Sequence, residues 1–459
     1  MKACVRLLLF SLLCTALVSK ADLLSATLDY SQNNYRKAFK QFQQLAELGN
    51  KDAIYNIGVM HLHGQGVDKN PARAYAWFSL AAEFGLEEAR SAAQIIANQL
   101  KQPALLAQEQ QALFGKLNYA LFSDTLKPIF SAAPVNESSE KLPERIYTLD
   151  PQYPKEAYEK GIEGWVWLEF DVDESGAVTD IDIIDAFPNR TFDRAIYNAV
   201  KHWRYQPYQV NGQNAAYRNR SLLYHFTTFK GKRYQASFAK QKRGYQRKIS
   251  RLIEEAEQGN ALVQYYIANW MVTDDHNATR LLKYHWQQDT AGSDLLLDSA
   301  INGYPNSQYR LGANLLRGEF TQADRKKGLN WLLYAAQAGN SFAQYRLARE
   351  LLDKRYVEYD PEKAQRWLEQ AAEQDIFRAK RDLLALYIEQ KQLATAQEFI
   401  STLTSNELEH PEILIAQSQL MLRNKKIVEA KTLANAAIKQ ARSRSWSDKP
   451  YQAFLQANF

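Results

Sequence analysis

The sequence predicts an α + α/β multidomain protein in which two α-solenoid blocks lie on either side of a small two-layer domain. A 36-residue pattern recurs in both halves of the chain, which is typical of stacked helical repeats. Between these regions apolar and polar residues alternate as in strands. At 459 residues the chain is long enough for about three domains.

Residues 1–21 have the features of a secretory signal peptide. A basic start is followed by an apolar run over 7–18 and by small residues at Ser19 and Ala21. A membrane-spanning helix needs about 20 apolar residues, so this run is short for a span. We expect export with cleavage before Asp22, and an uncleaved membrane anchor is the alternative.

Charge and cysteine content exclude several classes of protein. Lys and Arg number 57 against 51 Asp and Glu, and without residues 1–21 the balance is 54 against 51. This near balance gives no support to nucleic-acid binding. Both cysteines, Cys4 and Cys14, lie in residues 1–21, so the remaining chain has no disulfide, thiol nucleophile or cysteine ligand. An exported chain without cysteine fits the bacterial periplasm.

The helical blocks are expected over residues 22–125 and 245–459. Copies of the pattern start at Ala53, Ser307 and Ala343, and each copy places a tryptophan and an Ala-Ala pair in the same columns. These columns have helical spacing, so each copy is a helix–turn–helix unit with small residues where its helices meet. Only a neighbouring unit can cover the apolar face of each unit, which predicts a curved α-solenoid. The aligned tryptophans are Trp77, Trp331 and Trp367.

This pattern resembles the Sel-one-like repeat, a relative of the tetratricopeptide repeat. Residues 64–67 of the first full copy, Gly-Gln-Gly-Val, match that family's Gly-x-Gly-Val loop, whereas 318–320 and 354–356 depart from it. A fainter copy that starts at Gly259-Asn260 is stretched to 44 residues. The resemblance implies a helical scaffold whose concave surfaces hold other protein segments.

The middle domain, over residues 143–229, is expected to contain a three-stranded antiparallel sheet and a helix. The first strand places Val166 and its alternate neighbours on one face, with Trp165 and Trp167 on the other. The expected elements are strands over 164–172, 177–186 and 220–229, a turn over 173–176 and a helix over 192–205. Linkers are expected over 126–142 and 230–244.

The residues of this domain resemble the TonB C-terminal domain in order and spacing. A departure is Ala186-Phe187 before Pro188, where that family usually has serine two residues before the proline. The resemblance implies that the domain receives an extended peptide from an outer-membrane transporter along a sheet edge. The matching residues are Tyr153-Pro154, Ala157, Gly161, Gly164, Val166, Phe170, Gly176, Val178, Pro188, Phe192-Asp193, Ala195, Ala199, Trp203-Arg204, Pro207 and Asn211-Gly212.

The last strand has no expected successor, so its outer border would expose unpaired backbone N–H and C=O groups. A partner peptide could pair with them by strand addition. The tryptophans at 165 and 167 are further interface candidates if they are exposed together, and cover by a neighbouring domain is the other interpretation. The predicted partner-binding residues are Ser221, Leu223, His225, Thr227, Trp165 and Trp167.

No catalytic residue, cofactor or metal site is predicted. Residues 171–176 resemble the start of a calcium loop, but the loop requires a glutamate where Asp182 stands, and a hairpin turn explains the same residues. His61 and His63 provide only two possible ligands, and packing and solvent exposure on a helix are the favoured interpretation. We find no convincing acid–base pair, since the helical carboxylates look solvated.

Residues 230–251 hold nine basic and no acidic residues. A solvated connector is one interpretation, and contact with anionic headgroups or the cell wall is the other. We therefore expect a non-catalytic periplasmic adaptor whose partners are cell-envelope proteins, outer-membrane transporters among them. A TonB-type energy transducer that keeps residues 1–21 as its anchor is the alternative.

Overall fold

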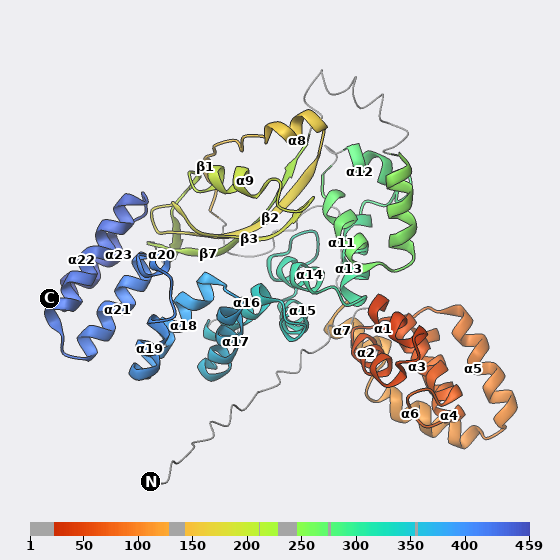
Figure 1. The fold of residues 1–459 in the computed structure, drawn as a ribbon. Coiled ribbons are helices and arrows are strands. Elements are labelled where there is room, and N and C mark those ends of the chain that lie inside the picture. Colours follow the sequence, from red (N-terminus) through yellow and green to blue (C-terminus); the bar gives the residue numbers. More distant parts are fainter. Residues whose placement is uncertain (1–22, 128–142, 211, 228–245, 274–276, 354–356) are drawn as a thin grey trace, which may run out of the picture.

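The computed structural model describes residues 23–127, 143–210, 212–227, 246–273, 277–353 and 357–459. Helical repeats form two blocks, and a small sheet domain lies against the second block (Figure 1). This arrangement confirms the predicted fold class. The predicted signal peptide, nearly all of both linkers and the loop at 354–356 lie outside the described residues.

The N-terminal block consists of antiparallel helix pairs. Asn50, Asn70 and Asn118 each start a helix, because the side-chain oxygen accepts a hydrogen bond from a backbone N–H in the first turn. Gly64 ends α3 in the left-handed region with φ 75°. The helices are α1 (Leu23–Ser31), α2 (Tyr35–Glu47), α3 (Lys51–His63), α4 (Pro71–Glu83), α5 (Glu87–Leu100), α6 (Pro103–Phe114) and α7 (Tyr119–Thr125).

The C-terminal block continues the same pattern from residue 246, where a helical stretch runs to 257. In the stretched copy α11 and α13 pack together, and α12 lies in the connection between them. The helices are α11 (Ala261–Trp270), α12 (Asn277–Leu282), α13 (Ala291–Ile301), α14 (Pro305–Arg317), α15 (Arg325–Gln337), α16 (Ser341–Leu352), α17 (Pro361–Glu373), α18 (Phe377–Glu389), α19 (Leu393–Ile400), α20 (Ser405–Leu408), α21 (Pro411–Arg423), α22 (Ile427–Ser443) and α23 (Lys449–Asn458).

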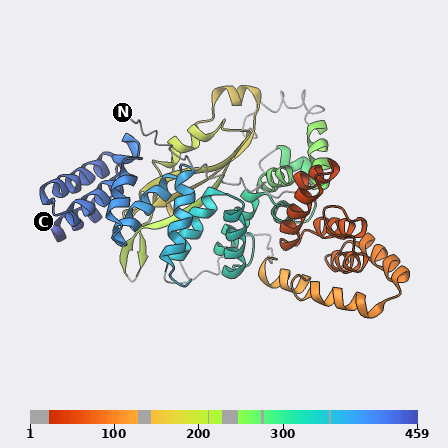
Figure 2. The ribbon, with the colours of Figure 1, turned by 60° about the horizontal axis from the view of Figure 1, so that its bottom comes forward.

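The two blocks touch each other, although the sheet domain separates them in the sequence. Asn50 Nδ2 donates to Asn302 Oδ1 at 2.8 Å, and Leu23 N donates to the Asn302 carbonyl at 3.1 Å. At the other end of the contact Trp331 Nε1 donates to the Leu126 carbonyl at 2.8 Å. Apolar residues of both blocks belong to one buried cluster, so the first block is anchored on the second (Figures 1 and 2).

The sheet domain has a three-stranded antiparallel sheet in the order β3–β2–β7. Helix α9 packs on its inner face, where Phe192, Ile196 and Trp203 are fully buried. Gly176, with φ 88°, turns the β2–β3 hairpin, and a Cβ there would lie 2.0 Å from the Tyr205 carbonyl oxygen. The elements are β1 (Arg145–Tyr147), α8 (Lys155–Lys160), β2 (Gly164–Val172), β3 (Val178–Phe187), α9 (Asp193–Val200), β4 (Arg204–Tyr205), β5 (Tyr208–Val210), β6 (Gln213–Ala215) and β7 (Tyr217–Phe226).

Three features of this domain differ from the sequence-based expectation. The helix ends at Val200 and not at 205, because Arg204 and Tyr205 pair with β1 as a short strand. The chain then forms a small β5–β6 hairpin over 208–215 before the last strand. That strand begins at Tyr217, earlier than expected. Within the described ranges no helix combines the length and apolar character that crossing a bilayer requires.

Candidate partner-binding site

The border of the sheet at β7 is the predicted docking site. Strand β7 pairs with β2 along its length, from Gly164 opposite Phe226 to Val172 opposite Tyr217. Among the described residues no other strand pairs with β7. Most of its residues are half-buried, as expected for a strand at a border. The backbone groups on that side are therefore available for a further strand.

The predicted contact residues on β7 share one face of the sheet. Cross-strand neighbours lie on the same face of a sheet, and Leu223 pairs with Trp167 and His225 with Trp165. Ser221 belongs to the same row, because its Oγ accepts a hydrogen bond from Trp167 Nε1 at 2.9 Å. All three side chains are half-buried, as is that of Thr227 just after the strand. This row faces the C-terminal helices.

Trp165 and Trp167 are buried, with 0% and 1% of their surface exposed. The Trp165 ring meets Tyr265 of α11 edge-on at 5.7 Å, and the Trp167 ring lies 5.2 Å from Tyr309 of α14. The C-terminal helices therefore cover both tryptophans, which agrees with the second of the two interpretations drawn from the sequence. A partner cannot reach either ring while the sheet and the helices stay together.

One column of the repeat supplies the surface that covers the sheet. In successive copies of the C-terminal block this column holds Tyr265, Tyr309, Tyr345 and Arg381, and each is at most 2% exposed. Because the first helix of every copy points this residue to the same side, the column forms a row along the concave surface. The sheet lies along that row (Figure 1). All nine residues of β2 are buried as a result.

A cluster of buried charges joins the acidic end of this sheet face to α18. Arg378, 1% exposed, donates from Nε to Asp182 Oδ2 at 2.5 Å. Its Nη2 lies 3.6 Å from Glu169 Oε2 and its Nη1 lies 3.5 Å from Asp171 Oδ1. Glu169 also accepts a hydrogen bond from Tyr309 Oη at 2.7 Å. The guanidinium is thus shared among three carboxylates, which raises the pKa of Arg378 despite its burial.

A second arginine repeats the arrangement one turn further along α18. Arg381 Nη1 lies 2.6 Å from Asp180 Oδ2, and its Nε lies 3.0 Å from Glu412 Oε2. His410 Nε2 lies 2.9 Å from the other oxygen of Asp180. Burial alone would raise the pKa of Asp180, but the charges of His410 and Arg381 outweigh it and lower that pKa. The outer face of the sheet is therefore sealed by ion pairs as well as by aromatic rings.

The sequence interpretation missed this cluster and treated the carboxylates as ordinary. The available signal was a row of four acidic residues on the outer sheet face, which solvent alone does not explain. Two arginines in repeat columns where no other aligned copy carries a basic residue were the second signal. The acidic residues are Glu169, Asp171, Asp180 and Asp182, and the arginines are Arg378 and Arg381.

The residues weighed for metal binding have other partners or surroundings. Asp173 Oδ1 accepts hydrogen bonds from the backbone N–H groups of Ser175 and Ala177, both at 2.9 Å, as in a hairpin turn. His61 packs edge-on against Phe39 at 5.7 Å, and burial lowers the pKa of its imidazole. In the described part of the chain no group of three or more possible ligands comes together.

Comparison with known families identifies both kinds of domain. Residues 150–227 match the Gram-negative bacterial TonB protein C-terminal family, and residues 28–50, 51–85, 305–340 and 341–376 match the Sel1 repeat. The chain therefore contains a TonB C-terminal domain with Sel1 repeats on both sides, which confirms the resemblances drawn from the sequence. Neither family is a family of enzymes.

Similar proteins extend this finding to individual relatives. Protein TonB of Xanthomonas campestris pv. campestris is 41% identical over 70 residues, which cover 15% of this chain and 31% of the relative. Protein TonB of Escherichia coli K12 is 40% identical over 65 residues, 14% of this chain and 27% of the relative. The chain thus spans about a third or less of these relatives. A crystal structure of a Sel1 repeat protein from Oxalobacter formigenes is 28% identical, covers 30% of this chain and 97% of that one, and has a TM-score of 0.27.

Proposed function

We propose that this protein is a periplasmic adaptor whose sheet domain binds an extended peptide from a cell-envelope partner at the β7 border. The observation that supports the proposal most is the contrast within one sheet. Its outer face is filled by the chain's own helices, whereas β7 has no further strand beside it among the described residues. Strand addition at such a border uses backbone hydrogen bonds and half-buried side chains.

The partner class comes from the TonB C-terminal domain. Outer-membrane transporters are the partners that this domain type implies, so their periplasm-facing segments are the first candidates. Ser221, Leu223, His225 and Thr227 would flank the added strand and contribute to its selectivity. Trp165 and Trp167 would contribute indirectly, because they lie on the covered face and hold β2 and β7 against the helices.

Disulfide trapping tests this site with little background. Both cysteines of the sequence lie in residues 1–21, so a protein that starts at Asp22 has no thiol of its own. A single cysteine at Thr227 or Leu223 is incubated with synthetic transporter peptides that carry one cysteine at successive positions. We expect cross-links at alternate peptide positions, since successive side chains of a strand point to opposite faces.

The matched control places the cysteine at the other border of the sheet, at Ile183 of β3. Strand β3 also has no further strand beside it among the described residues, so this control tests whether the peptide selects β7, and the proposal expects little cross-linking at Ile183. Equal trapping at Ile183, or trapping at Thr227 without any dependence on peptide position, contradicts strand addition at β7.

We propose further that residues 1–21 are removed during export. N-terminal sequencing of the protein from a periplasmic extract should then begin at Asp22. Recovery of the intact N-terminus in the membrane fraction contradicts removal and supports the energy-transducer alternative.

A further inference from the structure

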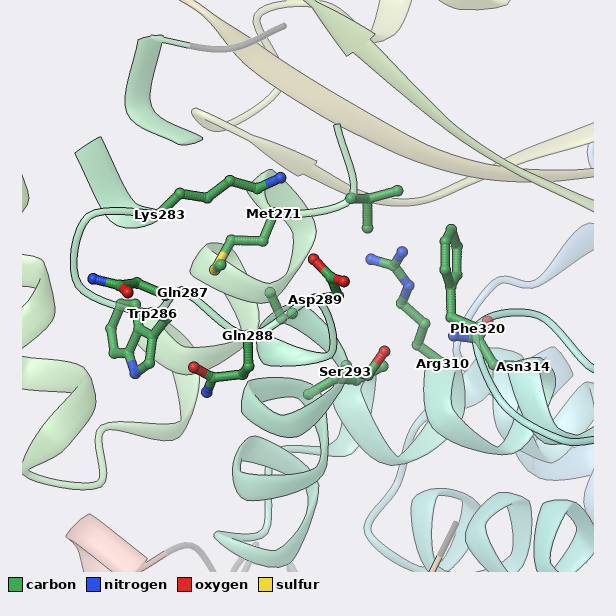
Figure 3. A pocket seen from close by; sticks show the side chains of 14 residues that line it. Met271, Lys283, Trp286, Gln287, Gln288, Asp289, Ser293, Arg310, Asn314 and Phe320 are labelled. Atoms are coloured by element: carbon green, nitrogen blue, oxygen red, sulfur yellow. The ribbon is translucent and has the colours of Figure 1, made fainter. Parts of the chain in front are cut away.

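A pocket of about 390 Å³ opens between α11, α13 and α14 next to the sheet (Figure 3). Its rim is polar and exposed, with Lys283, Gln288 and Asp289. Polar and apolar side chains share its walls, and the apolar ones include Trp286 and Phe320. The volume is within the range of small-molecule sites, about 300–1,000 Å³.

The pocket lies on the side of the sheet where β7 is. Helix α14 passes beneath the strands, since Asn306 donates to Asp185 of β3 at 2.8 Å and Tyr309 donates to Glu169 of β2 at 2.7 Å. Beyond the end of α14, burial would raise the pKa of Glu319, but the charge of Arg317 outweighs it, with smaller contributions from Arg310 and from Arg220 of β7. Helix α14 thus runs from β3 past β2, and its second half, which lines the pocket, continues toward the β7 side of the sheet.

Arg310 lines this pocket and forms no ion pair with any of the described residues. The residue is 6% exposed, and its guanidinium lies 6.0 Å from the ring of Trp167. Its Nη1 is buried without a hydrogen-bond partner, and no carboxylate of the described residues forms an ion pair with it. The charge of Glu319 has a raising effect on the pKa of Arg310, but the ion pair of Glu319 is with Arg317, at 2.9 Å. Figure 3 shows the side chain of Arg310 reaching into the pocket beside Asn314. An unpaired buried cation is costly, and burial accordingly lowers the pKa of Arg310.

In the next repeat the arginine that corresponds to Arg310 has an acidic partner. Arg346 occupies the same column one copy later, and its Nε donates to Glu350 Oε1 at 3.0 Å. The position that corresponds to Glu350 in the copy of Arg310 holds Asn314. Asn314 is 5% exposed and is a neutral amide, so the carboxylate of the repeat is replaced by a group that can only add hydrogen bonds.

We propose that this pocket binds a carboxylate attached to an apolar group, with Arg310 as its counter-ion and Asn314 as a second donor. A buried arginine that lines a pocket favours a carboxylate because it offers paired N–H donors. The carboxylate is either the acidic side chain of a peptide strand at β7 or part of a free small acid. The peptide source rests on the proposed function, and the free-acid source does not.

The test uses the protein from Asp22 onward and isothermal titration with sodium 4-phenylbutyrate, with 4-phenylbutanol as the uncharged control. We expect saturable binding of the acid only. Arg310→Met and Asn314→Glu should each weaken it at least tenfold. The second variant acts because the introduced carboxylate supplies the missing counter-ion from the chain itself.

Thermal unfolding separates binding from folding. We expect Arg310→Met and Asn314→Glu to keep or raise the unfolding temperature, because the first removes the unpaired buried charge and the second gives it a counter-ion. Arg346→Met, the matched control, should lower it, because it leaves Glu350 with one partner fewer. Lower stability of Arg310→Met would show a structural role and overturn the proposal.

A second arm identifies the source of the carboxylate. Transporter peptides with and without an acidic residue are trapped on a cysteine at Thr227, in the original background and with Arg310→Met. An acidic residue that improves trapping only when Arg310 is present assigns the pocket to the peptide. Arg310-dependent binding of 4-phenylbutyrate without peptide trapping supports the pocket and contradicts the proposed function. Absence of Arg310-dependent binding in both arms overturns the pocket proposal.

Discussion

The two repeat blocks share one pattern but use one of its columns differently. In the C-terminal block the column holds Tyr309, Tyr345 and Arg381, which are buried against the sheet domain. In the N-terminal block the same column holds Tyr55, which is half-exposed and packs on Phe78 of its own repeat at 4.9 Å. The small residues of the repeat make the solenoid in both blocks. The residue in this single column decides what lies on the concave surface.

The difference explains why the sheet domain has no open face, whereas its border strands β3 and β7 each pair only with β2 among the described residues. A sheet that is covered only by its own helix would leave the tryptophans of β2 in solvent. The C-terminal block covers them, and a buried sheet face no longer alternates between apolar and exposed positions. The N-terminal block contacts the C-terminal helices through Asn50 and Asn302. Its own concave surface is thus a separate one.

The largest expected difference in stability is between substitutions at one repeat column in the two blocks. Arg378→Ala leaves Glu169, Asp171 and Asp182 buried with less positive charge, and removal of one partner of a buried ion pair costs about 3–5 kcal/mol. Asp52 occupies the same repeat column in the N-terminal block and is exposed, so Asp52→Ala should stay within about 0.5 kcal/mol. Urea unfolding measures both. Similar losses for the two variants would contradict the assignment of the column.

The next effect concerns the tyrosines of the column. Tyr309→Phe removes the hydroxyl that donates to buried Glu169, and a hydrogen bond to a charged group contributes about 1.5–3 kcal/mol. Tyr55→Phe is the matched change in the N-terminal block and should cost less than about 0.5 kcal/mol. The measurement is the same urea series. If Tyr55→Phe lowers the free energy of unfolding as much as Tyr309→Phe does, the cost at Tyr309 cannot be assigned to its hydrogen bond with Glu169.

A third comparison tests the part of the pattern that both blocks share. A Cβ at Gly312 would lie 2.9 Å from the backbone oxygen of Gly328, whereas a Cβ at Gly58 would meet the ring of Phe78. A helix backbone yields less than a side chain, so Gly312→Ala should cost about 1–3 kcal/mol, reduced by about 1 kcal/mol of gained helix propensity. Gly58→Ala should cost less, as read from unfolding temperatures. The reverse order would contradict close packing of α14 on α15.

The local elements could be predicted from the sequence, and the sealing of the sheet could not. Strand β2 spans the predicted residues 164–172 because strict alternation ends at a glycine-containing turn. The repeat columns were visible because tryptophan and paired alanines recur at one spacing. The contacts of Glu169 and Asp182 with Arg378 join residues about two hundred positions apart, and no local periodicity encodes them.

The last strand lies at a border of the sheet, as predicted, but its residue bounds differ from the predicted ones. The last strand runs over 217–226 in place of 220–229 because the hairpin over 208–215 was not expected. That hairpin has few apolar residues and three-residue strands, so its periodicity is weak. The predicted contacts on β7 remain predictions, and Trp165 and Trp167 lie behind the sheet instead of on an open surface.

The smallest expected effect on stability near neutral pH comes from the buried carboxylates, because their contribution changes only in acid. The pKa values of Asp180 and Asp382 are lowered in the folded protein, because the charges of Arg381 and its neighbours outweigh burial. Their stabilising contribution is therefore complete above the unfolded value of about 3.9 and is lost as the pH falls below it. Asp52 in the N-terminal block has a raised pKa, chiefly because the surrounding chain desolvates it, so protonation there does not weaken that block.

Hydrogen exchange as a function of pH measures this difference. Protection of β2 and β3 should stay constant from pH 8 to about pH 5 and fall below about pH 4, before protection of α3 and α4 is lost. Earlier loss in the N-terminal block would contradict the role of the buried carboxylates.

Hydrogen exchange of the protein with and without a trapped transporter peptide shows directly where the partner binds. We expect added protection over residues 217–227, with unchanged protection in α14 and α18, because the peptide adds at the border and leaves the sealed face intact. Loss of protection in α14 or α18 would show that the partner enters between the sheet and the helices, and would contradict strand addition at β7.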